Sequence, residues 1–269
     1  MQSYICTTCG VGYAPSATPP SHCAICEDER QYVNGNGQGW TTLAELQAAH
    51  QNDIREQEPG LYGIGALPQI GIGQRALYIQ QPGGGVLWDC TPLVTDAAVA
   101  EIKGLGGLRA IAISHPHFYA SMVDWSEAFG GVPIHLHEAN RQYVMRLSEH
   151  IAYWSGETLD LGQGVTLVRS GGHFVGSSVL HWVAGAGGKG VLMTGDSIMV
   201  VPDTRWVSFM YSYPNLIPLP AREVRRIAGT VAPLAFDRIY SAWWDRVLKQ
   251  DAKARLAASV ERYLSAIAE

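Results

Sequence analysis

The cysteines near the start of this chain stand in two closely spaced pairs. Each pair reads Cys-x-x-Cys, which lets two sulfurs curl onto one cation, and the thirteen residues between the pairs are enough to bring them together. No stretch before the first cysteine resembles a secretory signal, and in a reducing compartment cysteines at this spacing are more often metal ligands than disulfides. The sequence therefore predicts a tetrahedral site for structural zinc, with iron as the competing metal. Its ligands are Cys6, Cys9, Cys23 and Cys26.

A second group of side chains that bind metals lies further along the chain. Its members are three histidines and an aspartate, and each comes shortly after a predicted strand. Because ligands in layered α/β folds gather beyond the carboxyl ends of strands, we expect these side chains to form a metal site. They are His115 and His117 after the strand at 110–113, His173 after the strand at 165–168, and Asp196 after the strand at 190–193.

The elements that must position these groups follow an order typical of layered sheets. The apolar run 110–113 reads as a strand covered on both faces, and with a helix ending near Phe129 and a strand at 132–137 it predicts a right-handed parallel crossover. Earlier, the runs 75–81 and 86–89 flank three glycines and predict a hairpin. Further strands are expected at 179–183 and 236–240, and helices at 41–50 (capped by Thr41 or Thr42, with Glu45 near its third position), 95–103, 221–232 and 248–268.

Composition sets the class of protein. Hydrophobic residues make up 47% of the 269 residues and charged residues 16%, which is typical of a well-packed soluble domain. The net charge of −5 gives no basic surface for nucleic acid, and no apolar run reaches the ~20 residues of a membrane helix. We expect a cytoplasmic protein without nucleic-acid or membrane partners, and leave open a homo-oligomer. The expected domains are a four-cysteine module at 1–33, a linker with a short helix at 34–59, and a main domain at 60–269.

Three motifs in this order resemble the metallo-β-lactamase superfamily of metal-dependent hydrolases. They read SHPHFYAS, GGHFVGSS and LMTGDS, and the resemblance extends over about residues 60–245. It implies an α/β fold of the αββα sandwich type, to which the four-cysteine module is added. It also implies that His115, His117 and His173 form the first metal position and that Asp196 touches or bridges the metals. Asp89, at the end of VLWDC, matches an early aspartate of the superfamily, and we expect it to order loops under the site.

The chain departs from the superfamily pattern at the second metal position. The expected Asp-His falls at Tyr119 and Ala120, and the last histidine is missing, since none follows His181 and the final strand leads into Trp243 and Trp244. Three of the four ligands of the second metal are therefore absent from the sequence. We expect one metal in the main domain, held by three imidazoles and by Asp196, with zinc or iron(II) as candidates.

One metal of this kind is sufficient for hydrolysis, because it lowers the pKa of a bound water to about 7 and polarises a carbonyl. The sequence thus predicts a hydrolase of a small-molecule ester, lactone, thioester or amide, with Asp196 as ligand or holder of the water. Tyr119 is the second candidate catalytic residue, as a hydrogen-bond donor to developing negative charge or a weak ligand. The alternative is a buried aromatic ring that fills the vacated second position.

Two other functions remain open at this point. A member of the superfamily that lost its second metal can serve as a metal-binding scaffold without activity. CTTCGVGY also resembles the first knuckle of rubredoxins, which would make the module an iron site for electron transfer. Among the remaining candidates, His137 is a substrate contact or a support for the site, and His181 and Cys90 are packing residues. The aromatic segment 205–214 forms a pocket wall, a subunit contact or a loop packed against the core.

Overall fold

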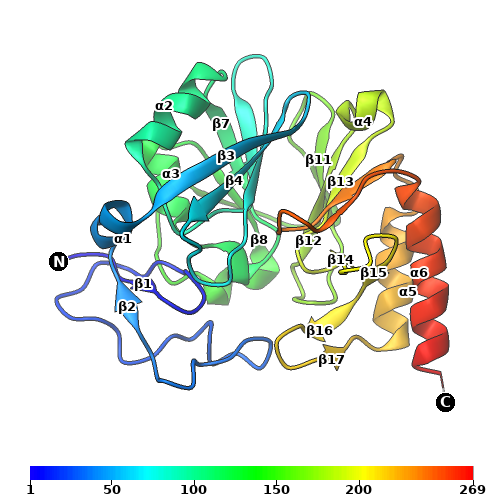
Figure 1. Cartoon of the computed structure of the whole chain (residues 1–269), viewed down its shortest axis with the longest axis horizontal. Helices are drawn as coiled ribbons and strands as arrows, with labels where there is room; N and C mark the ends of the chain where they lie inside the picture. The colour runs from blue at the N-terminus through cyan, green and yellow to red at the C-terminus, as the bar shows by residue number, and fades with distance from the viewer. Residues whose placement is uncertain (269) are drawn as a thin grey trace. The chain divides into compact units, whose positions relative to one another are not determined.

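The chain forms two compact units. The structure is a computed structural model that describes residues 1–268 (Figure 1). The first unit comprises Met1–Leu136 and Arg141–Tyr153, and the second comprises His137–Asn140 and the chain from Trp154 onward. Within residues 1–268, no helix has the length and apolar character required to cross a membrane.

The first unit is built on a seven-stranded sheet whose strands follow one another in sequence order from β3 to β9. Strands β3 to β6 pair antiparallel, whereas β6, β7 and β8 pair in parallel. Helix α2 connects β6 to β7, and α3 lies between β7 and β8 in the chain (Figure 1). Because parallel crossovers are right-handed and both connections advance in the same direction across the sheet, the two helices are expected on the same face of it. The elements are β1 (Ile5–Cys6), β2 (Trp40–Thr41), α1 (Leu43–Ala49), β3 (Gln51–Glu58), β4 (Leu61–Leu67), β5 (Ala76–Ile79), β6 (Gly85–Trp88), α2 (Asp96–Gly104), β7 (Leu108–Ala112), α3 (Met122–Ala128), β8 (Ile134–His137) and β9 (Ile151–Trp154).

Several local predictions for this unit are confirmed. Thr42 caps α1, and the Glu45 carboxylate accepts a hydrogen bond from the Thr42 backbone, which completes a capping box. The predicted hairpin is the antiparallel pair β5 and β6, and the predicted crossover ends in the parallel pair β7 and β8, with Ala112 opposite His135. These elements could be recognised because their signals are local.

Strands β3 and β4 were not predicted from the sequence. Strand β3 reads QNDIREQE and is largely exposed or half-buried along its length, because it forms an edge of the sheet. A polar edge strand is protected against pairing with other chains, but it lacks the apolar alternation by which strands are recognised. Strand β4 contains two glycines, which further weaken the strand pattern.

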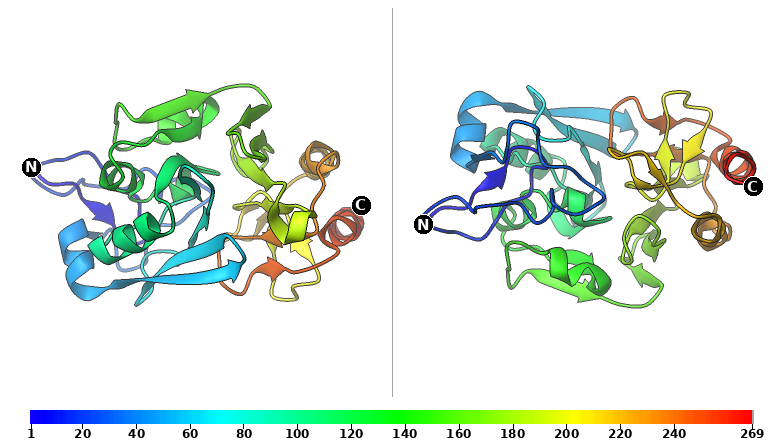
Figure 2. Two further views of the ribbon diagram at one scale, coloured as in Figure 1. Left: turned by 90° about the horizontal axis from the view of Figure 1, so that it is seen from above. Right: turned by 90° about the horizontal axis from the view of Figure 1, so that it is seen from below.

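The second unit is built on a six-stranded sheet of order β10-β11-β12-β13-β18-β19. Helices α5 and α6 run side by side, as both views in Figure 2 show, and contribute to a buried apolar core with this sheet. Helix α6 begins after Asp251, later than predicted, because Val247–Leu248 pairs as β19. The elements are β10 (Thr158–Asp160), β11 (Val165–Arg169), β12 (Ser178–Trp182), α4 (Gly185–Gly188), β13 (Val191–Met193), β14 (Met199–Val200), β15 (Val207–Ser208), β16 (Met210–Ser212), β17 (Ile217–Pro218), α5 (Ala221–Val231), β18 (Arg238–Tyr240), β19 (Val247–Leu248) and α6 (Ala252–Ala266).

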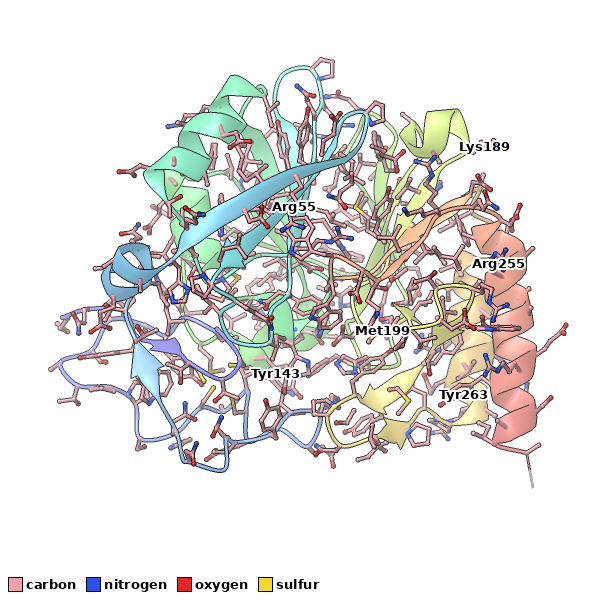
Figure 3. The ribbon with its side chains drawn as sticks, in the orientation of Figure 1. Arg55, Tyr143, Lys189, Met199, Arg255 and Tyr263 are labelled. Carbon is pink, nitrogen blue, oxygen red and sulfur yellow. The ribbon has the colours of Figure 1, made fainter. Side chains whose placement is uncertain are left out.

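The aromatic segment 205–214 belongs to the core of this unit. It forms β15 and β16, and Val207 and Phe209 are buried in the apolar cluster. The ring of Phe209 meets Tyr263 of α6 edge-on, with 5.6 Å between the ring centroids. Tyr263 is labelled in Figure 3. The packing interpretation of this segment is therefore the one that these contacts support, and Arg205 at its start pairs with exposed Asp203.

Candidate metal centres

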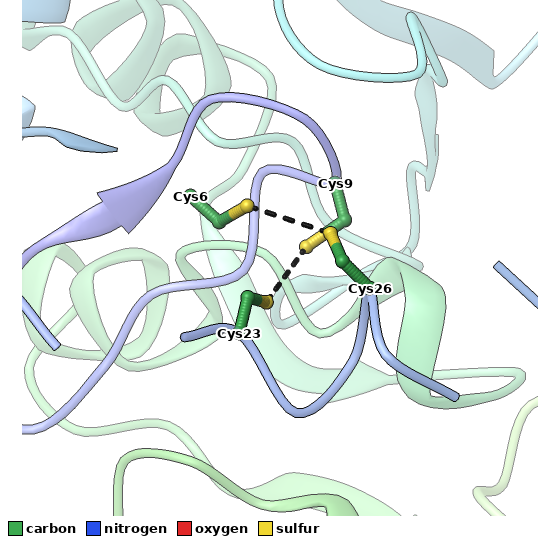
Figure 4. A group of neighbouring side chains, drawn as sticks. All are labelled: Cys6, Cys9, Cys23 and Cys26. Carbon is green, nitrogen blue, oxygen red and sulfur yellow. Dashed lines mark hydrogen bonds between the residues drawn. The ribbon is translucent and has the colours of Figure 1, made fainter. Parts of the chain in front are cut away.

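The four cysteines of the predicted zinc site converge on one point (Figure 4). Their sulfurs all lie within 4.8 Å of one another, and the Cys6–Cys26 and Cys9–Cys23 Sγ–Sγ distances are both 3.6 Å. A disulfide would require about 2.05 Å. In a tetrahedral site with metal–sulfur bonds of about 2.3 Å, the sulfurs stand about 3.8 Å apart. The arrangement thus fits a thiolate-bound metal and excludes disulfides among these residues.

Short-range structure brings the two cysteine pairs into place. Strand β1 ends at Cys6 and pairs with β2, while the N–H of Gly10 donates to the Cys6 carbonyl at 2.8 Å and closes the first knuckle. Gly10 has φ +81°, a conformation that favours glycine. The second knuckle closes in the same manner, through the Glu27 N–H and the Cys23 carbonyl at 3.0 Å. All four cysteine side chains are buried.

Two side chains donate hydrogen bonds to the sulfurs. The Gln38 amide donates from Nε2 to Cys6 Sγ at 3.1 Å, and the Tyr13 hydroxyl donates to Cys23 Sγ at 3.3 Å. Hydrogen bonds among the four thiols lower the pKa of Cys23 to about 7, with Cys26 as the largest cause, and lower the pKa of Cys6, with Cys23 as the largest cause, whereas they raise the pKa of Cys9 and Cys26. The Gln38 and Tyr13 donors stabilise negative charge on the sulfurs of Cys6 and Cys23, and the thiolate is the form that binds a metal.

In the first unit, His115 and His117 form a buried pair just past the end of β7. Their rings are nearly perpendicular, at 74°, with centroids 5.0 Å apart, and a ring nitrogen of one lies within 4.8 Å of a ring nitrogen of the other. Both side chains are 1% exposed. The pair lies on the loop that begins the 3₁₀ turn Pro116–Phe118.

Asp89 fixes the orientation of His115 through Ser114. One Asp89 oxygen, Oδ1, accepts hydrogen bonds from the Ser114 N–H and hydroxyl, both at 2.8 Å. The Ser114 oxygen lies 2.9 Å from His115 Nδ1. Since the single hydroxyl proton goes to Asp89, Ser114 accepts from His115 Nδ1–H, and the Nε2 atom of His115 carries the lone pair for a metal. The sequence-based expectation that Asp89 orders the loop under the site agrees with these bonds.

In the second unit, His173 and Asp196 form a corresponding pair. His173 Nδ1 lies 3.2 Å from the Met210 carbonyl, to which it can only donate, so that Nε2 carries the lone pair. Nε2 lies 3.7 Å from Asp196 Oδ2. Both side chains are buried, and Asp196 follows β13 in a turn that begins at Thr194 and passes through Gly195 at φ +51°.

Tyr119 and Ala120 stand where the sequence resemblance led us to expect further ligands. Tyr119 is 2% exposed, and burial raises the pKa of its hydroxyl well above the ordinary value of 10. The hydroxyl therefore stays protonated and is a donor at neutral pH. Ala120 is also buried and adopts φ +42°, in the left-handed region.

Two of the other histidines have structural hydrogen bonds. His137 accepts from the Ala139 N–H through Nδ1 at 3.2 Å, and its Nε2 lies 3.1 Å from the Gly156 carbonyl, so neither nitrogen is directed at a metal. His181 Nε2 lies 2.6 Å from the Ala235 carbonyl, and its side chain is buried, as predicted for a packing residue. Cys90 is buried too, and this burial raises the pKa of its thiol.

Sequence reasoning missed the residues that support the ligands. Ser114 directly precedes His115 in the motif SHPH, and this position was the only feature of the sequence that could have indicated its role in orienting the histidine. Tyr13 and Gln38 approach the sulfurs across turns whose geometry is not encoded in a spacing rule. The carbonyl of Met210 carries no sequence signal, because every residue has one.

Comparison with known proteins identifies one relative and one fold. The chain is 49% identical over 269 residues to the uncharacterized protein YmaE of Bacillus subtilis (strain 168), covering 99% of this chain and 97% of YmaE. No family model matches the chain.

Among solved structures, VMB-1 aligns with a TM-score of 0.60 at 14% identity, covering 81% of this chain and 99% of VMB-1. The DIM-1 metallo-β-lactamase, in a structure exposed to ceftazidime, aligns with a TM-score of 0.56 at 12% identity, covering 79% of this chain and 97% of DIM-1. At these identities the likeness concerns the fold, and it confirms the predicted α/β fold of metallo-β-lactamase type.

Proposed function

Because the chain belongs to one family with the Bacillus subtilis protein YmaE and has the metallo-β-lactamase fold, we propose that it is a metal-dependent hydrolase. In this proposal the two pairs of ligands, His115 with His117 and His173 with Asp196, bind one metal between them. The substrate is a small molecule with an ester, lactone, thioester or amide bond. The site of action is the cytoplasm.

The observation that carries the proposal is the hydrogen bonding of two histidines, one in each unit. His115 and His173 both engage Nδ1 with an oxygen, and both therefore hold Nε2 in the form that binds a metal. A histidine that only packs in a core does not need to carry its proton on Nδ1 and leave the Nε2 lone pair available. Three neutral imidazoles with a carboxylate are a donor set that suits zinc and iron(II).

A metal at such a site supplies an acidified water, with a pKa of about 7, and a Lewis acid for the carbonyl of the substrate. The chain itself supplies orientation and proton transfer. Asp196 Oδ2 lies 3.7 Å from His173 Nε2, close to the atom that binds the metal, and can accept a proton or act as a further ligand. Tyr119 can donate its hydroxyl proton in a hydrogen bond to developing negative charge, because its raised pKa keeps it neutral.

The proposed site holds one metal, since Tyr119 and Ala120 stand where two ligands of a second metal are expected from the superfamily pattern. Together with the cysteine site, the chain would carry two metals. Zinc is the proposed metal at both. Iron at the cysteine site would give a visible thiolate absorption in freshly purified protein, whereas a colourless protein with two zincs fits the proposal.

The test combines elemental analysis with a hydrolysis panel. Full-length protein should carry two metals per chain, and the His115→Ala variant should carry one. The wild-type protein should hydrolyse at least one member of a panel of esters, lactones, thioesters and amides, including a β-lactam, and His115→Ala should not. Wild-type protein with only the cysteine-bound metal would refute the metal site, and three metals per chain would refute the single-metal assignment.

The burial of Tyr119 favours a second candidate function, a metal-binding scaffold without turnover. A tyrosine that fills the second metal position would leave a stable metal site with little room for chemistry. Three results together would support the scaffold over the hydrolase. The chain would carry two metals, the panel would show no turnover, and the cellular function would survive the His115→Ala substitution.

A further inference from the structure

A backbone hydrogen bond joins the four-cysteine module to the loop that carries His115 and His117. The Gly12 N–H donates to the Ala120 carbonyl at 3.0 Å. Ala120 stands three residues after His117 and adopts φ +42°, a conformation that L residues other than Asn and Asp rarely adopt. The bond therefore falls on the residue of the loop whose backbone most needs external support.

Gly12 is held in turn by residues on either side of it. The carbonyl of the preceding residue, Val11, accepts from the Cys6 N–H at 3.1 Å. The following residue, Tyr13, donates its hydroxyl to Cys23 Sγ at 3.3 Å and accepts from the Ala24 N–H at 2.9 Å. The position of the Gly12 N–H thus depends on both knuckles.

A second line of contacts leads from the knuckle to the same loop. Gly10 packs so closely on Pro92 that an added Cβ would come within 2.4 Å of its ring. The Pro92 carbonyl accepts a hydrogen bond from the Ser121 hydroxyl at 2.7 Å, one residue beyond Ala120. Tyr143, labelled in Figure 3, packs against the cysteine cluster from another part of the first unit.

We propose that the metal bound by the four cysteines positions the histidine loop, with Gly12 as the positioning residue that transmits its effect. The metal holds the two knuckles together, the knuckles hold Gly12, and Gly12 holds Ala120 in its left-handed conformation. The order of the loop 114–121 then depends on occupancy of the cysteine site. As far as it concerns metal binding at His115 and His117, this inference rests on the proposed function.

Hydrogen–deuterium exchange tests the link without any reference to activity. In the full-length Cys23→Ser variant, the thiolate site loses a ligand. The amides of Phe118, Tyr119 and Met122, which donate to carbonyls within the loop, should then exchange at least about tenfold faster than in the wild type. Amides of the hairpin β5–β6 should keep their protection. Unchanged protection of the loop in this variant would overturn the inference.

Glycine substitutions test the route through Ala120. In Gly12→Ala, the added Cβ would lie 3.3 Å from the Ala120 carbonyl oxygen, so that this oxygen must move. We expect about tenfold weaker metal binding at the histidines, of the size seen when groups that orient metal ligands are removed. Gly35→Ala is the matched control, because its Cβ would meet nothing within 4 Å.

Adding Ala120→Gly to Gly12→Ala should recover most of the lost affinity and of the loop's protection, since glycine adopts positive φ without support. General destabilisation of the module would not be rescued in this manner, so failure of the rescue counts against the inference. If no variant, nor the wild type, binds a second metal, the proposed function is wrong. The exchange experiment then still decides whether the cysteine site orders the loop.

Discussion

The two candidate metal centres differ in how their ligands are distributed along the chain. The four cysteines lie within residues 6–26 and belong entirely to the first unit, where turns and a two-stranded sheet bring them together. The histidine and aspartate ligands span residues 115–196 and belong half to each unit. The cysteine site is therefore local, whereas the proposed catalytic site takes its ligands from residues that are far apart in the sequence.

The difference shows in what supports each ligand. Cysteine sulfurs receive hydrogen bonds from Tyr13 of the module and from Gln38 of the segment that directly follows it. His115 is oriented by Ser114 and Asp89 of the first unit, whereas His173 is oriented by a carbonyl of the second. A local site of this kind can hold a short segment of chain together, whereas each histidine depends on support from a different part of the chain. Substitutions at the two centres should thus have different consequences.

Loss of a cysteine ligand should have the largest effect. Cys26→Ser should abolish metal binding at the module, where structural zinc contributes on the order of 10 kcal/mol of apparent binding free energy in small domains. The first 40 residues should become sensitive to proteases, and metal content should fall by one per chain. Limited proteolysis and elemental analysis measure both, with Cys90→Ala as the control because that thiol lies outside the cluster. A Cys26→Ser variant that keeps both metals would contradict the assignment of a structural metal to the four cysteines.

Loss of a histidine ligand should remove activity and leave the fold intact. His173→Ala should lower kcat/KM by at least about 10³-fold, or about 4 kcal/mol, because the metal loses a ligand and the reaction loses its Lewis acid. The module should keep its metal. Turnover of the substrate found in the panel measures the loss of activity. The urea concentration at the midpoint of unfolding, which should stay unchanged, shows that the fold is intact. His22→Ala, at an exposed position of the module, is the control, and equal losses in both variants would contradict the assignment.

Removal of the support for His115 should have an intermediate effect. In Asp89→Asn, a neutral amide replaces the carboxylate that accepts the two hydrogen bonds from Ser114, so both bonds become weaker. The Ser114 hydroxyl is then less firmly oriented, and His115 is less firmly kept in the form that carries its proton on Nδ1. We expect metal affinity at the histidines to fall about 10- to 100-fold. Competition with a chelator measures this affinity. Asp160→Asn removes a carboxylate that accepts one N–H in an exposed turn and should leave the affinity unchanged.

The parts of the molecule that could be predicted from the sequence are those specified by short patterns. The Cys-x-x-Cys spacing, the capping box at Thr42 and Glu45, and the apolar run that became β7 all act over a few residues. The resemblance of three short motifs to a superfamily predicted the fold correctly, although the chain is only 14% identical to VMB-1 and 12% identical to DIM-1.

The parts that could not be predicted depend on contacts between distant residues. Strand β3 is a strand because β4 pairs with it, since its own residues are mostly polar. The hydrogen bond from Gly12 to Ala120 joins residues more than one hundred positions apart, and no local pattern marks either partner. The assignment of His115, His117, His173 and Asp196 to one metal stays a prediction for the same reason, because it joins residues of two units.

The smallest expected effect concerns a histidine that belongs to neither centre. Burial, and next the positive charge of Arg109, lower the pKa of His135 below its ordinary value of 6.5. The unfolded chain therefore takes up this proton before the folded chain does, so the stability present above pH 6.5 is lost as the pH falls from there through the lower pKa of the folded state. Urea midpoints of the wild type should decline gently across this range, and His135→Gln should flatten the decline, whereas exposed His22→Gln should not. An unchanged slope in His135→Gln would show that this imidazole is as easily protonated in the folded protein as in water.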